Sequence, residues 1–313
     1  MSDVLDLDTV ILGGGPAGLS AGIYMARSNA KTAIIDISMF GGQPSNYLEL
    51  ENYPGFPVVG GYDLMEKFEE QADKFGIEKY PFQEIVSVDL VSKPKKIVTK
   101  DYVFTADTVI IACGAKSKKL GIKGEDEFLG RGVSYCAVCD GAFYQDKTVA
   151  VVGGGNSALE EANYLTKFAK KVFVIHRRDE FRADKIIQER AFNNDKIEFV
   201  LDTTVEEIKG GDTVNGIVIK NKKTGASDVL SVDGVFPYIG FSPNISDING
   251  QVAQDANGFI ITDSTMQTSV EGVFAVGDVR NTPLRQVVTA ASDGAIGAVY
   301  AGKYLESLAK TKV

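Results

Sequence analysis

The stretch "TVILGGGPAGLSAGIYMARSNAKTAIIDI", at residues 9–37, has the pattern of one folding motif. A short apolar run leads through three glycines into a helical apolar pattern, and a second run rich in β-branched residues follows. This order predicts a βαβ dinucleotide-binding unit, whose glycine turn lets the backbone approach a pyrophosphate at the N-terminus of a helix. Gly13, Gly15 and Gly18 give the GxGxxG spacing, and Asp36 lies where an acid accepts the ribose hydroxyls of an adenosine.

The same pattern recurs later in the chain, as "VAVVGGGNSALEEANYLTKFAKKVFVIHR" at residues 149–177. Gly153 and Gly155 match the first two glycines of the earlier copy, and Ala158 takes the place of the third. One glycine turn of this kind is weak evidence, because such turns between a strand and a helix are common. Two copies that stay in register over about thirty residues predict two nucleotide-binding domains.

The two copies differ where the second strand ends. His176 stands at the position that matches Asp36, and Arg177, Arg178 and Arg182 follow it. A carboxylate at this point repels a 2′-phosphate, whereas guanidinium groups bind one through paired hydrogen bonds. The first site is therefore predicted to bind an unphosphorylated adenine dinucleotide and the second to bind NADPH. The alternative, a solvated basic helix start, does not explain the match between the two copies.

A further piece of the first site lies near the C-terminus. The strand pattern "VFAVGD" ends at Gly277 and Asp278, and a helical pattern begins after Arg285 and Gln286. An acid at the carboxyl end of a strand lies where α/β sheets bind ligands, and the helix N-terminus offers unpaired backbone donors. This segment is predicted to complete the first site, which makes the first domain discontinuous.

The predicted fold is α/β, with two Rossmann-like dinucleotide-binding domains of the three-layer ββα type. The NADPH-binding domain, residues 117–245, is inserted into a discontinuous domain made of residues 1–116 and 246–313. The crossings "CGAKSKKLG" and "IGFSPN" are rich in turn-forming residues, as linkers are. Residues 77–110 and 196–236 alternate β-branched runs with polar turns, which predicts a β-meander over each nucleotide-binding unit.

Composition argues against several classes of function. In 313 residues, acids outnumber bases by 42 to 33, which gives a net charge of −9 and a pI near 4.9. Binding to nucleic acid or to an anionic membrane needs a basic surface, so neither partner is expected. The acidic start runs directly into a strand pattern without the features of a secretory leader, and no apolar run is long enough to span a membrane. We therefore expect a cytoplasmic protein.

Two cysteines, Cys136 and Cys139, stand in "SYCAVCDGAF" at residues 134–143. A structural zinc site needs about four ligands, but the only further candidates are Cys113 and the single histidine, His176, which is surrounded by arginines. No metal site is therefore expected. A structural disulfide that closes two intervening residues would remove little entropy from the unfolded chain. Cycling between dithiol and disulfide is the interpretation that remains.

In their order and spacing, these motifs resemble those of the low-molecular-weight thioredoxin reductases over the full length of the chain. The matching stretches are "GGGPAGLSAGIYMAR", "GGQ", "ENYPGFP", "CAVCDG", "GGGNSALEEANYL", "HRRDEFRA", "VFAVGDV" and "RQVVTAA". The resemblance implies a homodimer that contains FAD and acts as an NADPH-dependent thioredoxin-disulfide reductase. In such a protein NADPH reduces FAD, FAD reduces the Cys136–Cys139 disulfide, and the dithiol reduces thioredoxin by thiol-disulfide exchange.

The resemblance also implies roles for single residues. It places FAD against Gly13, Gly15, Pro16, Ala17, Gly18, Asp36, Gly42, Gln43, Asn52, Gly277, Asp278, Arg285, Gln286 and Val287. It places the NADPH pyrophosphate against Gly153, Gly155, Asn156 and Ser157, and the 2′-phosphate against His176, Arg177, Arg178 and Arg182. In the redox motif it implies that Cys139 faces the flavin, Cys136 exchanges with thioredoxin and Asp140 donates a proton.

Three residues depart from the pattern of the family. Cys113 stands where threonine is usual, Tyr238 where a small residue is common, and Ser292 where glycine is frequent. We expect Cys113 to be an inert buried thiol. All three departures lie outside the redox motif.

The order of the motifs implies movement. The redox cysteines and the NADPH site share the inserted domain, yet both must reach one flavin on the other domain, and Cys136 must also meet a protein substrate. We therefore expect the inserted domain to rotate about its two linkers, as the family does.

Other functions make different predictions. The flavoprotein reductase of the alkyl hydroperoxide system would carry an additional N-terminal thioredoxin-like domain and would lack the arginine cluster, and a ferredoxin-type reductase of this fold would lack the CxxC motif. A nucleotide sensor or a zinc scaffold could keep both βαβ units, but it would be colourless or inactive in turnover. We expect a yellow protein that NADPH bleaches in the absence of oxygen.

Overall fold

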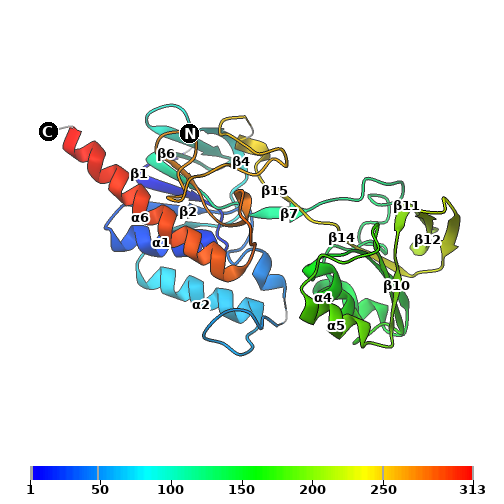
Figure 1. Ribbon diagram of the computed structural model, residues 1–313. Helices are drawn as coiled ribbons and strands as arrows, with labels where there is room; N and C mark the ends of the chain where they lie inside the picture. Colours follow the sequence, from blue (N-terminus) through cyan, green and yellow to red (C-terminus); the bar gives the residue numbers. More distant parts are fainter. Residues whose placement is uncertain (1–2, 48, 249, 312–313) are drawn as a thin grey trace. The chain divides into compact units, whose positions relative to one another are not determined.

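The computed structural model describes residues 3–47, 49–248 and 250–311, and the chain forms two compact units (Figure 1). The first unit comprises Met1–Lys116 and Ser242–Val313, and the second, which interrupts it, comprises Ser117–Phe241. The sequence places the return crossing at residue 246. The structural boundary lies earlier, because β15 (Phe241–Pro243) pairs with β7 (Ala115–Ser117) at the crossing itself.

A seven-stranded sheet forms the centre of the first unit, in the order β3-β2-β1-β6-β5-β4 with β16 beside β6. Its parallel strands are β1 (Asp3–Leu12), β2 (Thr32–Ile35), β3 (Glu78–Tyr80), β6 (Tyr102–Ile111) and β16 (Val273–Ala275). In the register of this sheet, Leu12 pairs with Ile35 and Ile111, and Ile111 pairs with Ala275. The loops that follow four strands therefore start at one edge of the sheet, where α/β folds bind ligands.

Two different layers cover this sheet. On one face lie the helices α1 (Pro16–Arg27), α2 (Gly61–Lys74) and α6 (Val287–Thr311), and Figure 1 shows α1 and α6 side by side. Because successive strand residues point to opposite faces, Ile11 and Ile110 pack into the helical layer, while Val10 and Val109 face the other way. That second core contains residues of the meander and of the returning segment, such as Ile97 and Ile260.

The meander of the first unit is continuous with the main sheet. It consists of β4 (Ile85–Asp89) and β5 (Lys95–Thr99), and β5 pairs antiparallel with the first half of β6. The long strand β6 makes this possible, because its second half remains available to pair with β16. The described part of this unit also contains the short 3₁₀ turns η1 (Gln43–Asn46), η3 (Ser246–Ile248) and η4 (Gly277–Val279).

The second unit repeats the plan around a smaller parallel sheet. Its strands, in the order β10-β9-β8-β14, are β10 (Ile197–Val200), β9 (Lys171–Ile175), β8 (Thr148–Gly153) and β14 (Gly234–Tyr238). The helices α4 (Asn156–Leu165) and α5 (Lys185–Phe192) cover one face, together with α3 (Ala137–Asp140) and the turn η2 (Gly141–Tyr144). The other face is covered by an antiparallel sheet of β11 (Thr203–Gly210), β12 (Val214–Asn221) and β13 (Ser227–Leu230).

The α/β prediction with two Rossmann-like sheets is therefore confirmed. Of the helices in the part of the chain that the structure describes, none has both the length and the apolar character needed to cross a membrane.

Candidate functional site

In the first glycine turn, close packing against other protein atoms requires two of the glycines but not the third. A Cβ on Gly13, which has φ +109°, would lie 2.4 Å from the carbonyl oxygen of Ala112, and a Cβ on Gly18 would lie 1.8 Å from that of Gly13. Gly15 has an ordinary φ of −78°, and the nearest atom to a Cβ there would be 3.8 Å away. Packing thus explains Gly13 and Gly18, whereas Gly15 leaves a cradle that a pyrophosphate fits.

The N-terminus of α1 opens into this cradle. Gly15 is its N-cap, Pro16 follows as the first helical residue, and no side chain of the described residues caps the helix by a hydrogen bond. Helix N-termini offer unpaired N–H groups and a partial positive charge, which suit an anionic phosphate. Ala17 is buried behind the turn, where it contacts α6: a Cβ on Gly294 would lie 2.2 Å from the Ala17 carbonyl oxygen.

Asp36 is held against the same turn. Its Oδ2 accepts a hydrogen bond from the Gly14 N–H at 2.6 Å, and its Oδ1 accepts from the Ser38 N–H at 2.8 Å. Oδ1 also accepts from the Ser38 hydroxyl at 2.9 Å, whereas Oδ2 keeps a second lone pair that can accept from a ribose hydroxyl. The carboxylate therefore lies beside the glycine turn at the end of β2.

The loop after β2 adds further predicted residues. The Gly41 N–H donates to the Gly14 carbonyl oxygen at 2.8 Å, which brings the loop onto the turn, and exposed Gly42 follows. Gln43 Nε2 donates to the Ala115 carbonyl oxygen. Asn52 Nδ2 donates to Gln286 Oε1 at 2.9 Å, so residues far apart in the sequence meet here.

Gly277 and Asp278 follow β16 and lie at this edge as well. A Cβ on Gly277, which has φ +72°, would lie 2.9 Å from the Cβ of Ala17. Burial raises the pKa of the Asp278 carboxyl to about 6, Arg285 opposes the rise and Asp293 adds to it.

Arg285 has an incompletely satisfied side chain. Its guanidinium lies over the ring of Phe259, with 4.0 Å from Cζ to the ring centroid. Its buried Nε has no hydrogen-bond partner among the residues that the structure describes. An unpaired buried N–H of a charged group is costly in a finished core, and it is the donor that an anionic cofactor would satisfy.

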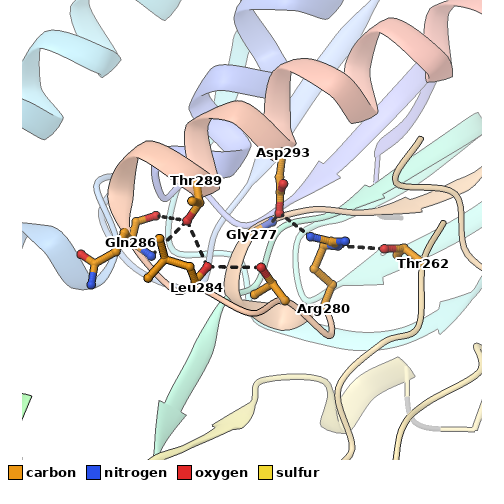
Figure 2. A network of polar contacts seen from close by, with 8 residues as sticks. Thr262, Gly277, Arg280, Leu284, Gln286, Thr289 and Asp293 are labelled. Carbon is orange, nitrogen blue, oxygen red and sulfur yellow. Dashed lines mark hydrogen bonds and ion pairs between the residues drawn. The ribbon is translucent and has the colours of Figure 1, made fainter. Parts of the chain in front are cut away.

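The sequence does not reveal the network that fixes the start of α6 (Figure 2). Asp293 Oδ2 accepts from Arg280 Nη1 at 3.0 Å and from the Gly277 N–H at 3.2 Å, and Arg280 Nε donates to Thr262 Oγ1 at 2.8 Å. At the helix start, Thr289 Oγ1 accepts from the Gln286 N–H at 3.1 Å. The feature of the sequence that could have pointed to this network is Asp293, an acid within an apolar helical pattern. The network holds the turn after β16 against α6, whose first residue is Val287.

The second glycine turn likewise contains glycines that packing requires and one that it does not. A Cβ on Gly153 would lie 2.3 Å from the Tyr238 carbonyl oxygen, and one on Gly154 would lie 2.3 Å from the ring of His176. Gly155 has φ −101° and no atom within 4 Å of a Cβ built there. This turn too has one glycine that the described protein atoms do not require, at the N-terminus of α4.

His176 is placed differently from the three arginines with which the sequence groups it. It is 5% exposed, its ring stacks on Phe181, and its Nε2 lies 3.1 Å from the Glu180 carbonyl oxygen, to which the neutral ring can donate. Burial lowers the pKa of His176, and the neighbouring arginines lower it further, so the ring stays uncharged near neutral pH. His176 therefore packs beneath Gly154 and shapes the turn.

The arginines lie at the surface around this turn. Arg177, Arg178 and Arg182 are all exposed, and the Arg182 N–H donates to the Gly154 carbonyl oxygen at 2.7 Å. The arrangement brings an exposed cationic loop next to the open glycine turn of the same unit.

Asn156 joins the glycine turn to the arginine loop through Asp184, which the sequence did not single out. Asn156 Nδ2 donates to Asp184 Oδ2, and the Asp184 N–H donates to Asn156 Oδ1, both at 2.7 Å. Asp184 is the N-cap of α5, and an acid before the helical pattern "KIIQERAF" was the available signal. Ser157, half-buried, follows in the first turn of α4.

In the redox motif, Cys136 is disulfide-bonded, whereas Cys113 is not part of a disulfide. The Cys136 N–H donates to Ser134 Oγ at 3.0 Å, and the Asp140 N–H donates to the Cys136 carbonyl oxygen at 3.1 Å. The side chain of Cys139 lies outside the described part of the structure. Cys113 is half-buried and its Sγ lies 3.3 Å from the Leu12 carbonyl oxygen, so it sits at the cofactor edge of the first sheet.

Comparison with known proteins extends these observations. A family model described as "Pyridine nucleotide-disulphide oxidoreductase" matches residues 7–294. A thioredoxin reductase of Peptoclostridium acidaminophilum is 48% identical over 314 residues, which cover 98% of this chain and 99% of that protein. The crystal structure of Lactococcus lactis thioredoxin reductase matches with a TM-score of 0.93 and 44% identity, over 96% of this chain and 99% of that one. The thioredoxin reductase of T. acidophilum matches with a TM-score of 0.90 and 34% identity, over 97% and 99% of the two chains.

Proposed function

The chain belongs to the pyridine nucleotide-disulphide oxidoreductase family, and on that basis we propose how its residues carry out the reduction of thioredoxin. The chain is an NADPH-dependent flavoprotein oxidoreductase that reduces the disulfide of thioredoxin. The features found together in the second unit are the main support for the roles that we propose for its residues. Disulfide-bonded Cys136, an open glycine turn at Gly155 and three exposed arginines occur in one compact body.

The first unit is the FAD-binding domain. Gly15 gives the pyrophosphate access to the N-terminus of α1, Arg285 supplies the buried donor that lacks a protein partner, and Asp36 accepts the ribose hydroxyls. When bound there, FAD supplies the means to accept a hydride from NADPH and to pass two electrons to a disulfide. Asn52, Asp278, Gln286 and Val287 line the same edge of the sheet, where they orient the cofactor.

The second unit is the NADPH-binding domain. Gly155 gives the pyrophosphate access to the N-terminus of α4, and Arg177, Arg178 and Arg182 pair with the 2′-phosphate. His176, neutral and buried, supports the turn from below, so it contributes by position and not by charge.

The redox motif exchanges electrons with thioredoxin. The thiolate of Cys136 attacks one sulfur of the thioredoxin disulfide, a mixed disulfide forms, and the leaving sulfur takes a proton that Asp140 carries. The Cys139 thiolate then attacks the Cys136 sulfur, which restores the intramolecular disulfide and releases the second thioredoxin sulfur. The two electrons leave with thioredoxin, whose second sulfur takes a proton from solvent, so that thioredoxin departs as a dithiol.

Three further proposals follow from the family. The enzyme acts as a homodimer in the cytoplasm, and its NADPH-binding domain rotates about β7 and β15 during turnover.

A glycine substitution tests the assignment of the NADPH turn. Gly155→Ala adds a methyl group where the described protein atoms leave space, so the variant should fold and keep its flavin, while the KM for NADPH rises about tenfold or more. Gly211→Ala is the matched control, because Gly211 is also open and has no positive φ, yet lies in the β11–β12 hairpin. Steady-state assays of thioredoxin reduction give both values. An unchanged KM in Gly155→Ala would show that the pyrophosphate binds elsewhere.

A further inference from the structure

We propose that Tyr238 is a positioning residue that fastens the redox-active helix α3 to the NADPH-binding turn of the same unit. The inference rests on the proposed roles of Cys136 and of the glycine turn at Gly153. Its basis is one side-chain contact between two parts of the chain that are far apart in sequence: the Ala137 N–H donates to the Tyr238 hydroxyl oxygen at 2.9 Å.

The donor is an amide that needs a partner. Ala137 directly follows Cys136 and is the first residue of α3, and the first N–H groups of a helix have no partner within it. Ala137 is also completely buried, so solvent does not satisfy this amide. A buried N–H without an acceptor is strongly unfavourable, and the Tyr238 hydroxyl removes that cost at the residue that directly follows Cys136.

The other end of Tyr238 is fixed on the nucleotide turn. Tyr238 is the last residue of β14 and pairs in register with Gly153, the last residue of β8. A Cβ on Gly153 would lie 2.3 Å from the Tyr238 carbonyl oxygen, so the backbone of the two residues is in close contact. One residue thus contacts the first glycine of the NADPH turn through its backbone and the redox helix through its side chain.

The hydrogen bond from Ala137 to Tyr238 adds to backbone hydrogen bonds that already join β14 to the segment before the redox motif. Strand β14 is hydrogen-bonded to the segment before the redox motif. The Val235 N–H donates to the Gly132 carbonyl oxygen at 2.7 Å, and the Ser134 N–H donates to the Val235 carbonyl oxygen at 3.0 Å. After Ser134 these backbone bonds to β14 end, and the chain turns into Cys136. The hydroxyl of Tyr238 renews the connection to β14 three residues later, at Ala137.

This role explains why Tyr238 stands at a position where the sequence pattern of the family favours a small residue. A small side chain at the end of β14 could not reach the Ala137 amide. The aromatic ring packs partly buried against the same core cluster that contains Ala137, so the hydroxyl is held where it is needed. The redox helix should therefore keep its position in the NADPH-binding domain when the disulfide opens and a protein substrate exchanges with Cys136.

The test separates the two halves of the reaction in the holoenzyme. Tyr238→Phe removes only the hydroxyl, and we expect kcat for thioredoxin reduction to fall about tenfold. The KM for NADPH and the NADPH-dependent reduction of ferricyanide, which takes electrons from the flavin, should stay unchanged. Tyr144→Phe is the matched control: Tyr144 lies in the same cluster, and within the part of the chain that the structure describes its hydroxyl makes no hydrogen bond. Equal loss of both activities in Tyr238→Phe would overturn the proposal, because it would indicate a general structural defect.

A double-mutant cycle identifies the bond. Ala137→Pro removes the donor, and proline suits the first position of a helix. If the hydrogen bond carries the effect, Tyr238→Phe should change kcat by less than twofold in the Ala137→Pro background. The same tenfold loss in that background would refute the role of the bond. A wild-type enzyme that does not reduce thioredoxin would instead refute the proposed function.

Discussion

Glu161 is the residue whose replacement should change stability most clearly with pH. It lies on α4 in the core of the second unit, where it is 6% exposed, and its Oε2 has no hydrogen-bond partner among the described residues. Burial, with a smaller contribution from Glu160, raises the pKa of the Glu161 carboxyl from 4.5 to about 7.

The direction and size of the effect follow from proton linkage. Between pH 4.5 and 7 the unfolded chain has released the Glu161 proton while the folded protein still holds it, so the free energy of unfolding falls as the pH rises. At about 1.4 kcal/mol for each pKa unit, the whole loss amounts to about 3 kcal/mol, and about 2 kcal/mol of it falls between pH 5.5 and 8.5. This range also avoids the pI near 4.9.

Glu161→Gln should remove this loss, because the amide is neutral at every pH. We expect the unfolding free energy of the variant to rise relative to the wild type by about 2 kcal/mol between pH 5.5 and 8.5. Urea unfolding followed by circular dichroism at several pH values gives this quantity. Glu160→Gln removes a carboxyl from the exposed side of the same helix and leaves the burial of Glu161 unchanged, so its trend with pH should be much smaller. A difference between Glu161→Gln and wild type that does not vary with pH would refute the reasoning.

Three shorter predictions concern the cofactor sites and the redox motif. Replacing Arg177 and Arg178 together by glutamine should raise the KM for NADPH about tenfold to a hundredfold and leave that for NADH nearly unchanged, whereas equal increases would argue against a phosphate site. Gly15→Ala should weaken retention of FAD, measured by flavin release on dilution, because the methyl group would occupy the cradle at α1; full retention would remove Gly15 from the site. Asp140→Asn should slow thioredoxin turnover at unchanged flavin content, and equal turnover would exclude Asp140 from proton transfer.

The glycine turns could be predicted from the sequence because their spacing reports steric requirements. A Cβ on Gly18 would meet the Gly13 carbonyl oxygen within the same turn, and a Cβ on Gly13 would meet Ala112 directly after the neighbouring strand β6, so the glycine spacing itself reports both close approaches. The fold class followed from the same local patterns, since each copy contains a strand, a turn and a helix in a fixed order.

Contacts between distant segments could not be predicted in this way. The Arg280–Asp293 ion pair and the contact between Ala137 and Tyr238 depend on the register of strands and helices, which no short pattern encodes. The placement of His176 shows the same limit. The repeat aligns it with Asp36, but the absence of a side chain on Gly154 leaves room for its ring, so it packs inward while its neighbours stay at the surface.

The central claim is that electrons enter from NADPH and leave through the cysteine pair, and an anaerobic titration of the purified flavoprotein with NADPH tests it most directly. Flavin absorbance and accessible thiols in denaturant are followed together. The account predicts that bleaching is complete after about two equivalents of NADPH per flavin, and that the thiol count rises from Cys113 alone to include Cys136 and Cys139. Bleaching with about one equivalent and no new thiols would contradict it.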